Sequence, residues 1–177
     1  MYGGVNKYCV FVIVTAVFIG AAQAQVTSLH PHGSGLEDID YPYPIHVFVL
    51  TIERQLLRMA QMDVAPSGPS NGRVVVLLHG KSLSGEYWAP TIAKFSADGY
   101  RLVVPDQLGF GKSAKPDIRD SFDLLARKTK MLFDSLGVTR AAIVGHSFGG
   151  LLKVYVARDY PETTAVLALP RPACREI

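Results

Sequence analysis

The residues best suited to chemistry form the segment Gly145-His146-Ser147-Phe148-Gly149-Gly150, which matches the pattern G-x-S-x-G. The segment lies between an apolar run and a run of helical period, so the pattern predicts a tight strand-to-helix turn. Such a turn lifts the Ser147 hydroxyl out of the sheet and aims the Phe148 amide at a developing oxyanion. The alternative is a tight turn that merely contains a serine. The flanking pattern favours a nucleophile for acyl transfer.

A second candidate loop, His79-Gly80-Lys81-Ser82-Leu83-Ser84-Gly85, follows an earlier apolar run. Ligands of open α/β sheets bind beyond the carboxyl ends of the strands, which is where this loop would lie. Acyl transfer needs two amide donors, and we expect the Lys81 N–H to be the partner of the Phe148 N–H. A glycine-rich loop after a strand can also serve only to turn the chain.

Other polar residues near these loops are predicted to have structural roles. We expect Asp106 to be a buried carboxylate that anchors a loop, His79 to be a loop anchor, and His146 to point away from the nucleophile. The glycines of the Gly109–Ser113 segment lack the spacing of a P-loop, and Pro116 disfavours a dinucleotide-binding helix. No cofactor and no metal site are expected.

The elements that must position these residues follow from hydrophobic patterning. Two β-like runs close enough to pair as a hairpin come first, and after a turn-rich linker strands alternate with helices. This alternation predicts an α/β fold whose doubly wound, mostly parallel sheet has right-handed crossovers and an N-terminal β-hairpin. The expected strands of the hairpin are 46–52 and 56–64, and the expected later strands are 74–78, 100–104, 141–144 and 165–169. The expected helices are a segment that contains Trp88, Ile92 and Phe95, a segment from Ser121 to Leu136, and residues 151–160.

The first 24 residues have the pattern of a secretory signal peptide, with Lys7, an apolar run and an Ala22-Gln23-Ala24 ending. The apolar run is shorter than the roughly 20 residues that span a bilayer, so no stable membrane anchor is expected. Cleavage near Ala24 would deliver a secreted or periplasmic protein. We expect residues 25–40 to be an irregular arm and residues 41–177 to be the domain.

Composition narrows the function classes further. The chain of 177 residues is 49% hydrophobic and 19% charged, which indicates one globular domain and argues against disorder. The formal net charge is +3 and the basic residues are scattered, so a nucleic-acid partner is not expected. Composition does not indicate the oligomeric state.

From about Tyr41 to Leu169 the chain resembles the α/β-hydrolase superfamily, specifically its single-domain serine members. The resemblance rests on the hairpin, His79-Gly80, the loop from Pro105 to Ser113, and the G-H-S-x-G-G elbow. It implies a nucleophile at Ser147, an oxyanion hole from the Lys81 and Phe148 amides, and small ester or related acyl substrates. Serine at the elbow argues against the dehalogenase and epoxide-hydrolase branches, which use aspartate there.

The resemblance also implies an acid and then a histidine after the nucleophile, and both are missing. All histidines precede Ser147: His30, His32, His46, His79 and His146. Asp159 lies along the following helix, roughly 18 Å from Ser147 at a rise of 1.5 Å per residue. The 177 residues therefore read as the N-terminal part of a hydrolase, truncated or frame-shifted, with at most residual activity. The alternative is a non-catalytic fragment or binding module.

The same reading predicts a weak point in the sheet. The strand 165–169 would have an unpaired edge, and one face of the sheet would be partly uncovered. We therefore expect the 177 residues alone to aggregate or to pack loosely.

Overall fold

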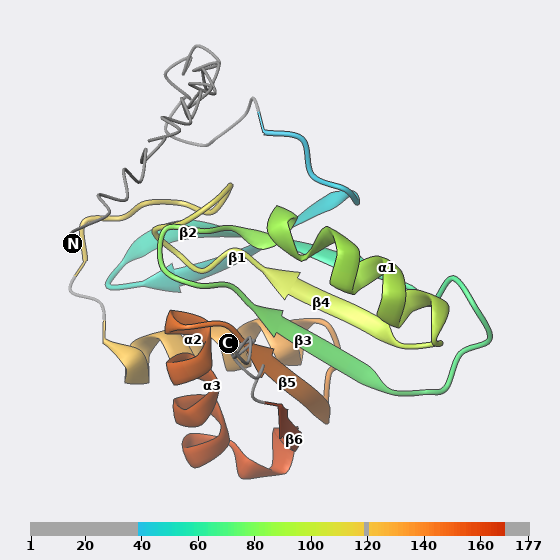
Figure 1. The fold of residues 1–177 in the computed structure, drawn as a ribbon. Helices are drawn as coiled ribbons and strands as arrows, with labels where there is room; N and C mark the ends of the chain where they lie inside the picture. Colours follow the sequence, from blue (N-terminus) through green and yellow to red (C-terminus); the bar gives the residue numbers. More distant parts are fainter. Residues whose placement is uncertain (1–38, 119–120, 169–177) are drawn as a thin grey trace, which may run out of the picture. The chain divides into compact units, whose positions relative to one another are not determined.

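A computed structural model of the chain describes residues 39–118 and 121–168. The predicted signal peptide, most of the predicted arm and Leu169 lie outside the described residues. Within them, six strands form one sheet of order β1-β2-β4-β3-β5-β6 (Figure 1). The strands are β1 (Ile45–Ile52), β2 (Gln55–Val64), β3 (Val74–Leu78), β4 (Arg101–Pro105), β5 (Ala141–Gly145) and β6 (Thr164–Ala168).

The pairing confirms the predicted fold class. Strands β1 and β2 form an antiparallel hairpin, β2 runs antiparallel to β4, and β3, β4, β5 and β6 are parallel. The hairpin turns at Glu53 and Arg54, whose φ angles of 47° and 65° are those of a type I′ turn. Each observed strand differs from its predicted range by no more than one residue at either end.

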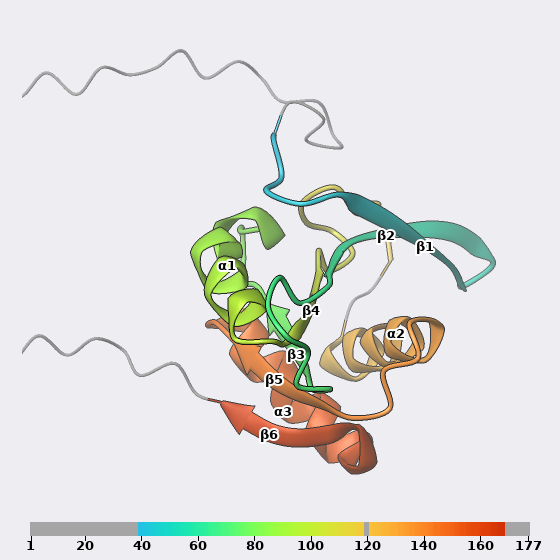
Figure 2. The same cartoon turned by 90° about the vertical axis from the view of Figure 1, so that its right-hand side faces the viewer.

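Helices lie on both faces of the sheet, as Figure 2 shows for α1 and α2. On one side are the 3-10 helix η1 (Gly85–Trp88) and α1 (Ala89–Ala97), and on the other α2 (Phe122–Ser135) and α3 (Phe148–Asp159), which η2 (Pro161–Thr163) follows. The Ser121 hydroxyl accepts a hydrogen bond from the Leu124 amide at 3.2 Å, which confirms the predicted helix cap.

One predicted helix boundary is wrong. Sequence patterning placed the last helix at 151–160, whereas α3 begins at Phe148, directly after Ser147. The first turn of α3 contains Gly149 and Gly150, which carry no apolar side chain and so gave no helical period. The helix therefore starts at the elbow itself.

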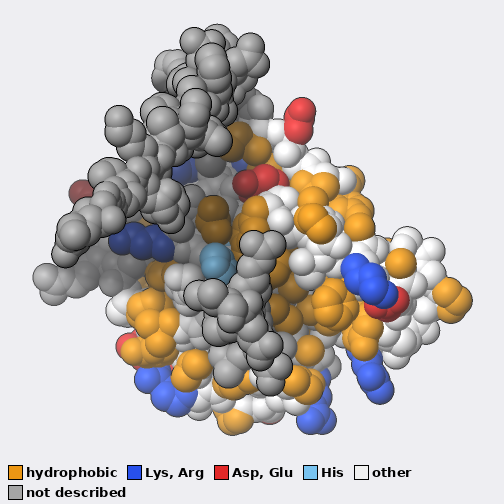
Figure 3. Space-filling view, viewed as in Figure 1, with side chains coloured by type: hydrophobic (Ala, Val, Ile, Leu, Met, Phe, Trp, Pro, Cys, Tyr) orange, Lys and Arg blue, Asp and Glu red, His pale blue; other side chains and the backbone are white. Residues whose placement is uncertain are grey.

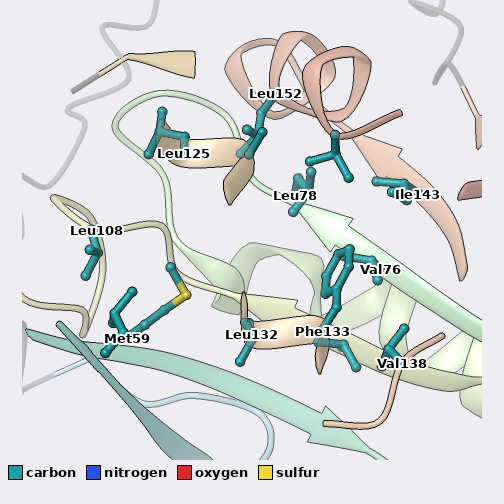
Figure 4. Packing of buried hydrophobic residues seen from close by; sticks show 14 of the residues in the cluster. Met59, Val76, Leu78, Leu108, Leu125, Leu132, Phe133, Val138, Ile143 and Leu152 are labelled. Atoms are coloured by element: carbon teal, nitrogen blue, oxygen red, sulfur yellow. The ribbon is translucent and has the colours of Figure 1, made fainter. Parts of the chain in front are cut away.

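The core between the sheet and helices α2 and α3 fixes the position of the elbow (Figure 4). Leu132 and Phe133 of α2 and Leu152 of α3 pack with Val76 and Ile143 of the sheet, and all five side chains are fully buried. Burying a large apolar side chain contributes about 1.5–3 kcal/mol. This packing holds α3 against the end of β5.

None of the helices within residues 39–118 and 121–168 is long and apolar enough to cross a membrane.

Candidate active site

Ser147 occupies the junction between β5 and α3, with its residue exposed. Its φ of 49° and ψ of −112° place a non-glycine residue in a sparsely populated region of backbone space. Such a conformation costs about 1–3 kcal/mol and persists only where the surrounding structure imposes it. The backbone thus has the strained strand-to-helix turn that the G-x-S-x-G pattern predicted.

Two glycines of the motif are required by close backbone approach. A Cβ atom added to Gly145 would lie 2.1 Å from the Gly149 carbonyl oxygen, and one added to Gly149 would lie 2.2 Å from the Leu78 carbonyl oxygen. Neither position can hold a larger residue without displacing the backbone. The start of α3 is consequently pressed against the end of β3.

The two predicted site loops leave the sheet at the same edge. Strands β3 and β5 are parallel neighbours, with Leu78 opposite Gly145, and the His146 amide donates to the Leu78 carbonyl at 3.0 Å. The loop that carries Lys81 and the turn that carries Ser147 therefore begin side by side. This is the arrangement that the oxyanion-hole prediction requires.

The hydrogen bond of the turn from Gly80 to Leu83 does not use the Lys81 N–H group. Leu83 N–H donates to the Gly80 carbonyl at 3.2 Å and Ser82 has a φ of 61°, as in a type II turn with Lys81 at the second position. Phe148 is the first residue of α3, so its N–H has no partner within the helix. Within the described residues, neither amide donates a hydrogen bond. Their role as oxyanion donors stays a prediction.

Aromatic rings hold the start of α3 in place. The Phe148 ring lies between those of Phe110 and Phe122, at centroid distances of 5.5 and 5.1 Å. Phe110 also meets the ring of His79 edge-on at 5.4 Å. Sequence reasoning missed Phe110 and Phe122, because contacts between segments far apart in the sequence leave no periodic signal.

His79 is a loop anchor, as predicted. It is fully buried, and its Nε2 atom accepts a hydrogen bond from the Gln107 amide at 2.9 Å. Because an amide can only donate, the ring proton must lie on Nδ1, 2.8 Å from the Gly80 carbonyl oxygen. Burial lowers the pKa of His79. With both nitrogens engaged, this histidine is not available as a base.

Asp106 anchors a loop, again as predicted. Its carboxylate is buried and accepts hydrogen bonds from the amides of Gly85 at 2.7 Å and Lys112 at 2.8 Å. The Tyr41 hydroxyl donates to the same carboxylate at 2.6 Å, and burial and this bond raise the pKa of Tyr41. Sequence reasoning missed Tyr41, which lies 65 residues from Asp106. The cluster ties the segment before β1 to two loops beside the site.

The remaining polar groups do not complete a catalytic triad within the described residues. The ring of His146 is exposed and lies 5.9 Å from that of Tyr87. Asp159 ends α3 and pairs with Arg158 at 2.6 Å, an interaction that lowers the pKa of Asp159. Its predicted position at the far end of the helix is confirmed. In the part of the chain that the structure describes, the Ser147 hydroxyl has no hydrogen bond, and no three His, Cys, Asp or Glu side chains gather as metal ligands.

A hollow of about 350 Å³ lies between the turn after β3 and the loop after β4. Figure 3 shows a histidine close to hydrophobic side chains on the face viewed as in Figure 1. Phe110, which contacts the Phe148 ring, also lines the hollow, so the hollow neighbours the elbow. Its lining is Ile39, Ser82, Leu83, Ser84, Glu86, Gly109, Phe110, Gly111 and Lys115.

Comparison with known proteins agrees with this geometry. Residues 73–169 match the family described as alpha/beta hydrolase fold. A crystal structure of a probable hydrolytic enzyme from Pseudomonas aeruginosa PAO1 is 43% identical with a TM-score of 0.76, over 78% of this chain and 44% of that one.

Two curated proteins are also similar. A 2-hydroxy-6-oxo-6-phenylhexa-2,4-dienoate hydrolase from Burkholderia cepacia is 36% identical over 57% of this chain and 37% of its own length. A haloalkane dehalogenase from Mycobacterium marinum is 31% identical over 74% of this chain and 44% of its own length. The chain thus spans less than half the length of each of these two curated relatives. Its strained elbow, its sheet order and the matched segment together establish that the chain belongs to the α/β-hydrolase family.

Proposed function

We propose that this chain is the nucleophile-bearing part of a serine hydrolase that acts on esters or related acyl compounds. The observation that carries the proposal is the strained backbone of Ser147 at the junction of β5 and α3, beside the loop that follows β3. A strained residue needs a compensating reason, and exposure of a nucleophilic hydroxyl at a sheet edge is one.

The proposed chemistry follows from this geometry. The Ser147 oxygen bonds to the acyl carbon while its proton passes to a histidine, and the leaving group departs with a proton from that histidine. The Lys81 and Phe148 amides donate to the oxyanion. Water then hydrolyses the acyl-enzyme. The histidine and its acid partner must come from a part of the fold other than the described residues. The hollow lined by Leu83 and Phe110 suits an apolar group of the substrate.

The decisive experiment is a chimaera in which residues 39–168 replace the matching segment of the 43%-identical Pseudomonas protein. A fluorophosphonate probe should label Ser147, and Ser147→Ala should abolish the labelling. Ser82→Ala, an exposed serine in the neighbouring turn, is the matched control and should keep it. Labelling that persists in Ser147→Ala, or a folded chimaera that is never labelled, would contradict the assignment.

The oxyanion hole is tested in the same chimaera by Lys81→Pro, which removes the Lys81 N–H. Proline is favoured at the second position of a type II turn, so the loop should keep its conformation. We expect kcat to fall by about 10²–10³. Lys81→Ala keeps the amide and should retain full activity, whereas equal losses in both variants would argue against the donor role.

We also propose that the protein is exported. This part of the proposal rests on the signal-peptide pattern of the first 24 residues alone. Amino-terminal sequencing of the protein from the extracellular or periplasmic fraction should start at Gln25. A start at Met1 in that fraction, or retention of the protein in the cytoplasm, would contradict cleavage near Ala24.

A second candidate function, a non-catalytic fragment or binding module, is favoured by one observation. His79 is locked by two hydrogen bonds, and no hydrogen bond joins Ser147 to any base within the described residues. Fluorophosphonate labelling of Ser147 in the folded chimaera separates the candidates, because a non-catalytic module would not be labelled. Turnover of p-nitrophenyl acetate by the 177-residue chain tests whether the chain itself holds a base. We expect only residual activity from the chain alone, and a kcat near 10 s⁻¹, about the median for enzymes, would mean that a base is present.

A further inference from the structure

The side chain of His146 lies against the loop that follows β3. A Cβ atom added to Gly80 would lie 2.8 Å from Nδ1 of His146 and 3.4 Å from its Cε1. A separation of 2.8 Å is shorter than packed atoms allow, so the ring occupies the space into which a side chain at position 80 would project. The His146 ring therefore packs on the α-carbon of Gly80.

Aromatic packing from η1 supports this ring. The centroid of the His146 ring lies 5.9 Å from that of Tyr87, with an angle of 58° between the ring planes. The Tyr87 ring lies 4.6 Å from the ring of Trp88, which is only 8% exposed. Although His146 is an exposed residue, its ring thus belongs to a row of rings that ends at a buried tryptophan.

The backbone of His146 is fixed as well. Its amide donates to the Leu78 carbonyl at 3.0 Å, and its carbonyl accepts a hydrogen bond from the Gly149 amide at 2.9 Å. These two bonds join His146 to the end of β3 and to the first turn of α3. The ring, and with it the backbone of Gly80, is therefore tied to the position of the elbow.

The peptide group between Gly80 and Lys81 is oriented by its own loop. The Gly80 carbonyl accepts hydrogen bonds from Nδ1–H of His79 at 2.8 Å and from the Leu83 amide at 3.2 Å. In a trans peptide the N–H points opposite to the C=O, so these bonds set the direction of the Lys81 N–H. Both bonds come from the loop itself, and neither joins the peptide group to the elbow.

We propose that His146 is a positioning residue whose ring holds the Lys81 amide at the distance from the Phe148 amide at which both reach one oxyanion. The inference rests on the proposed function, because this distance matters only if the two amides bind an oxyanion. Donors act at about 2.7–3.1 Å from the oxyanion, and a misplacement of about 1 Å can cost about 10²-fold in rate. Because the oxyanion forms only during the reaction, loss of the ring lowers kcat and leaves KM nearly unchanged.

The test measures kcat and KM for p-nitrophenyl acetate in the chimaera that carries residues 39–168. His146→Ala should lower kcat by about tenfold and change KM by less than about twofold. His146→Asn keeps an atom at the place of Nδ1 and should retain at least about half of kcat. His46→Ala, which removes an exposed histidine from β1, is the matched control and should leave both constants unchanged.

A double-mutant cycle distinguishes positioning from a general loss of packing. Gly80→Ala presses a methyl group against the His146 ring and should lower kcat by about tenfold. When Gly80→Ala is combined with His146→Ala, the methyl group takes the space that the ring has left. The combined loss in kcat should therefore be smaller than the product of the two single losses.

Hydrogen exchange in the full 177-residue chain gives a readout that does not depend on hydrolysis. His146→Ala should speed exchange of the Leu83 amide, which bonds to the Gly80 carbonyl, by about fivefold or more and leave the amides of β1 unchanged. Unchanged exchange at Leu83, multiplied losses in the double variant, or equal losses of kcat in His146→Asn and His146→Ala would each overturn the proposal.

The parent chimaera separates this inference from the proposed function. A folded parent that the fluorophosphonate probe does not label contradicts the proposed function. A parent that is labelled and active, together with full kcat in His146→Ala, contradicts the role of His146 alone.

Discussion

The elbow and the outer edge of β6 differ in how closely the described residues pack around them. At the elbow, Gly149 packs against the Leu78 carbonyl and three phenylalanine rings hold the start of α3. At the edge, Val166 and Leu167 remain exposed on opposite faces of the same strand. The described residues supply close contacts around Ser147, whereas none of them pairs with the outer edge of β6. Among the described residues, the turn at Ser147 is therefore closely packed while the last strand is exposed on both faces.

The contrast between a closely packed elbow and an exposed β6 edge would be wrong if position 149 accepted a larger residue without loss of stability. Gly149→Ala places a Cβ atom 2.2 Å from a backbone carbonyl of β3, so we expect a loss of at least about 3 kcal/mol in unfolding free energy. Gly150→Ala is the matched control, since its Cβ would lie 3.3 Å from the nearest atom and alanine favours the helix. Urea denaturation measures both, and similar stabilities for the two variants would show that the elbow can relax.

A sharper contrast compares one residue type on one face of the sheet. Val75→Ala removes buried methyl groups and should cost about 2 kcal/mol of unfolding free energy. Val166→Ala, in register with it but 57% exposed, should cost less than about 0.5 kcal/mol in the free chain. Thermal or urea unfolding of both variants checks this. Equal costs would mean that something already covers β6 in the free chain.

The loop beside the elbow should respond to acid. Burial lowers the pKa of His79 in the folded chain, so below the ordinary histidine value of about 6.5 only the unfolded chain takes up this proton. Unfolding free energy should thus fall as the pH drops through about 6.5, by up to about 1.4 kcal/mol per pH unit.

The variant His79→Gln should reduce that slope when urea unfolding is followed between pH 7.5 and roughly pH 5. A slope that survives in His79→Gln would assign the acid sensitivity to other groups.

The smallest expected change in unfolding free energy comes from relieving the backbone strain at Ser147. Ser147→Gly should stabilise the chain by about 1 kcal/mol, because glycine adopts positive φ without the cost that serine bears. Ser147→Ala bears the same cost and should be nearly neutral. Differential scanning calorimetry compares the two, and no gain in Ser147→Gly would show that the elbow stores little strain.

Sequence patterning alone determined the strand and helix order, because buried parallel strands appear as short apolar runs and helices as longer runs with a different period. It also located Ser147, since G-x-S-x-G between such runs has few other uses. It misplaced the start of α3, where two glycines carry no apolar signal. The anchoring roles of Asp106 and His79 could be predicted from their positions in loops after strands. Their hydrogen-bond partners could not be predicted from the sequence.

Only the tertiary structure decided which distant residues meet. Tyr41 reaches Asp106 across 65 residues, Phe148 packs between Phe110 and Phe122, and β3 and β5 bring the two site loops to one edge. Periodicity reports which face of an element is buried, because that depends on neighbours a few residues away. It does not report which other element covers that face, because that choice depends on how the whole chain packs.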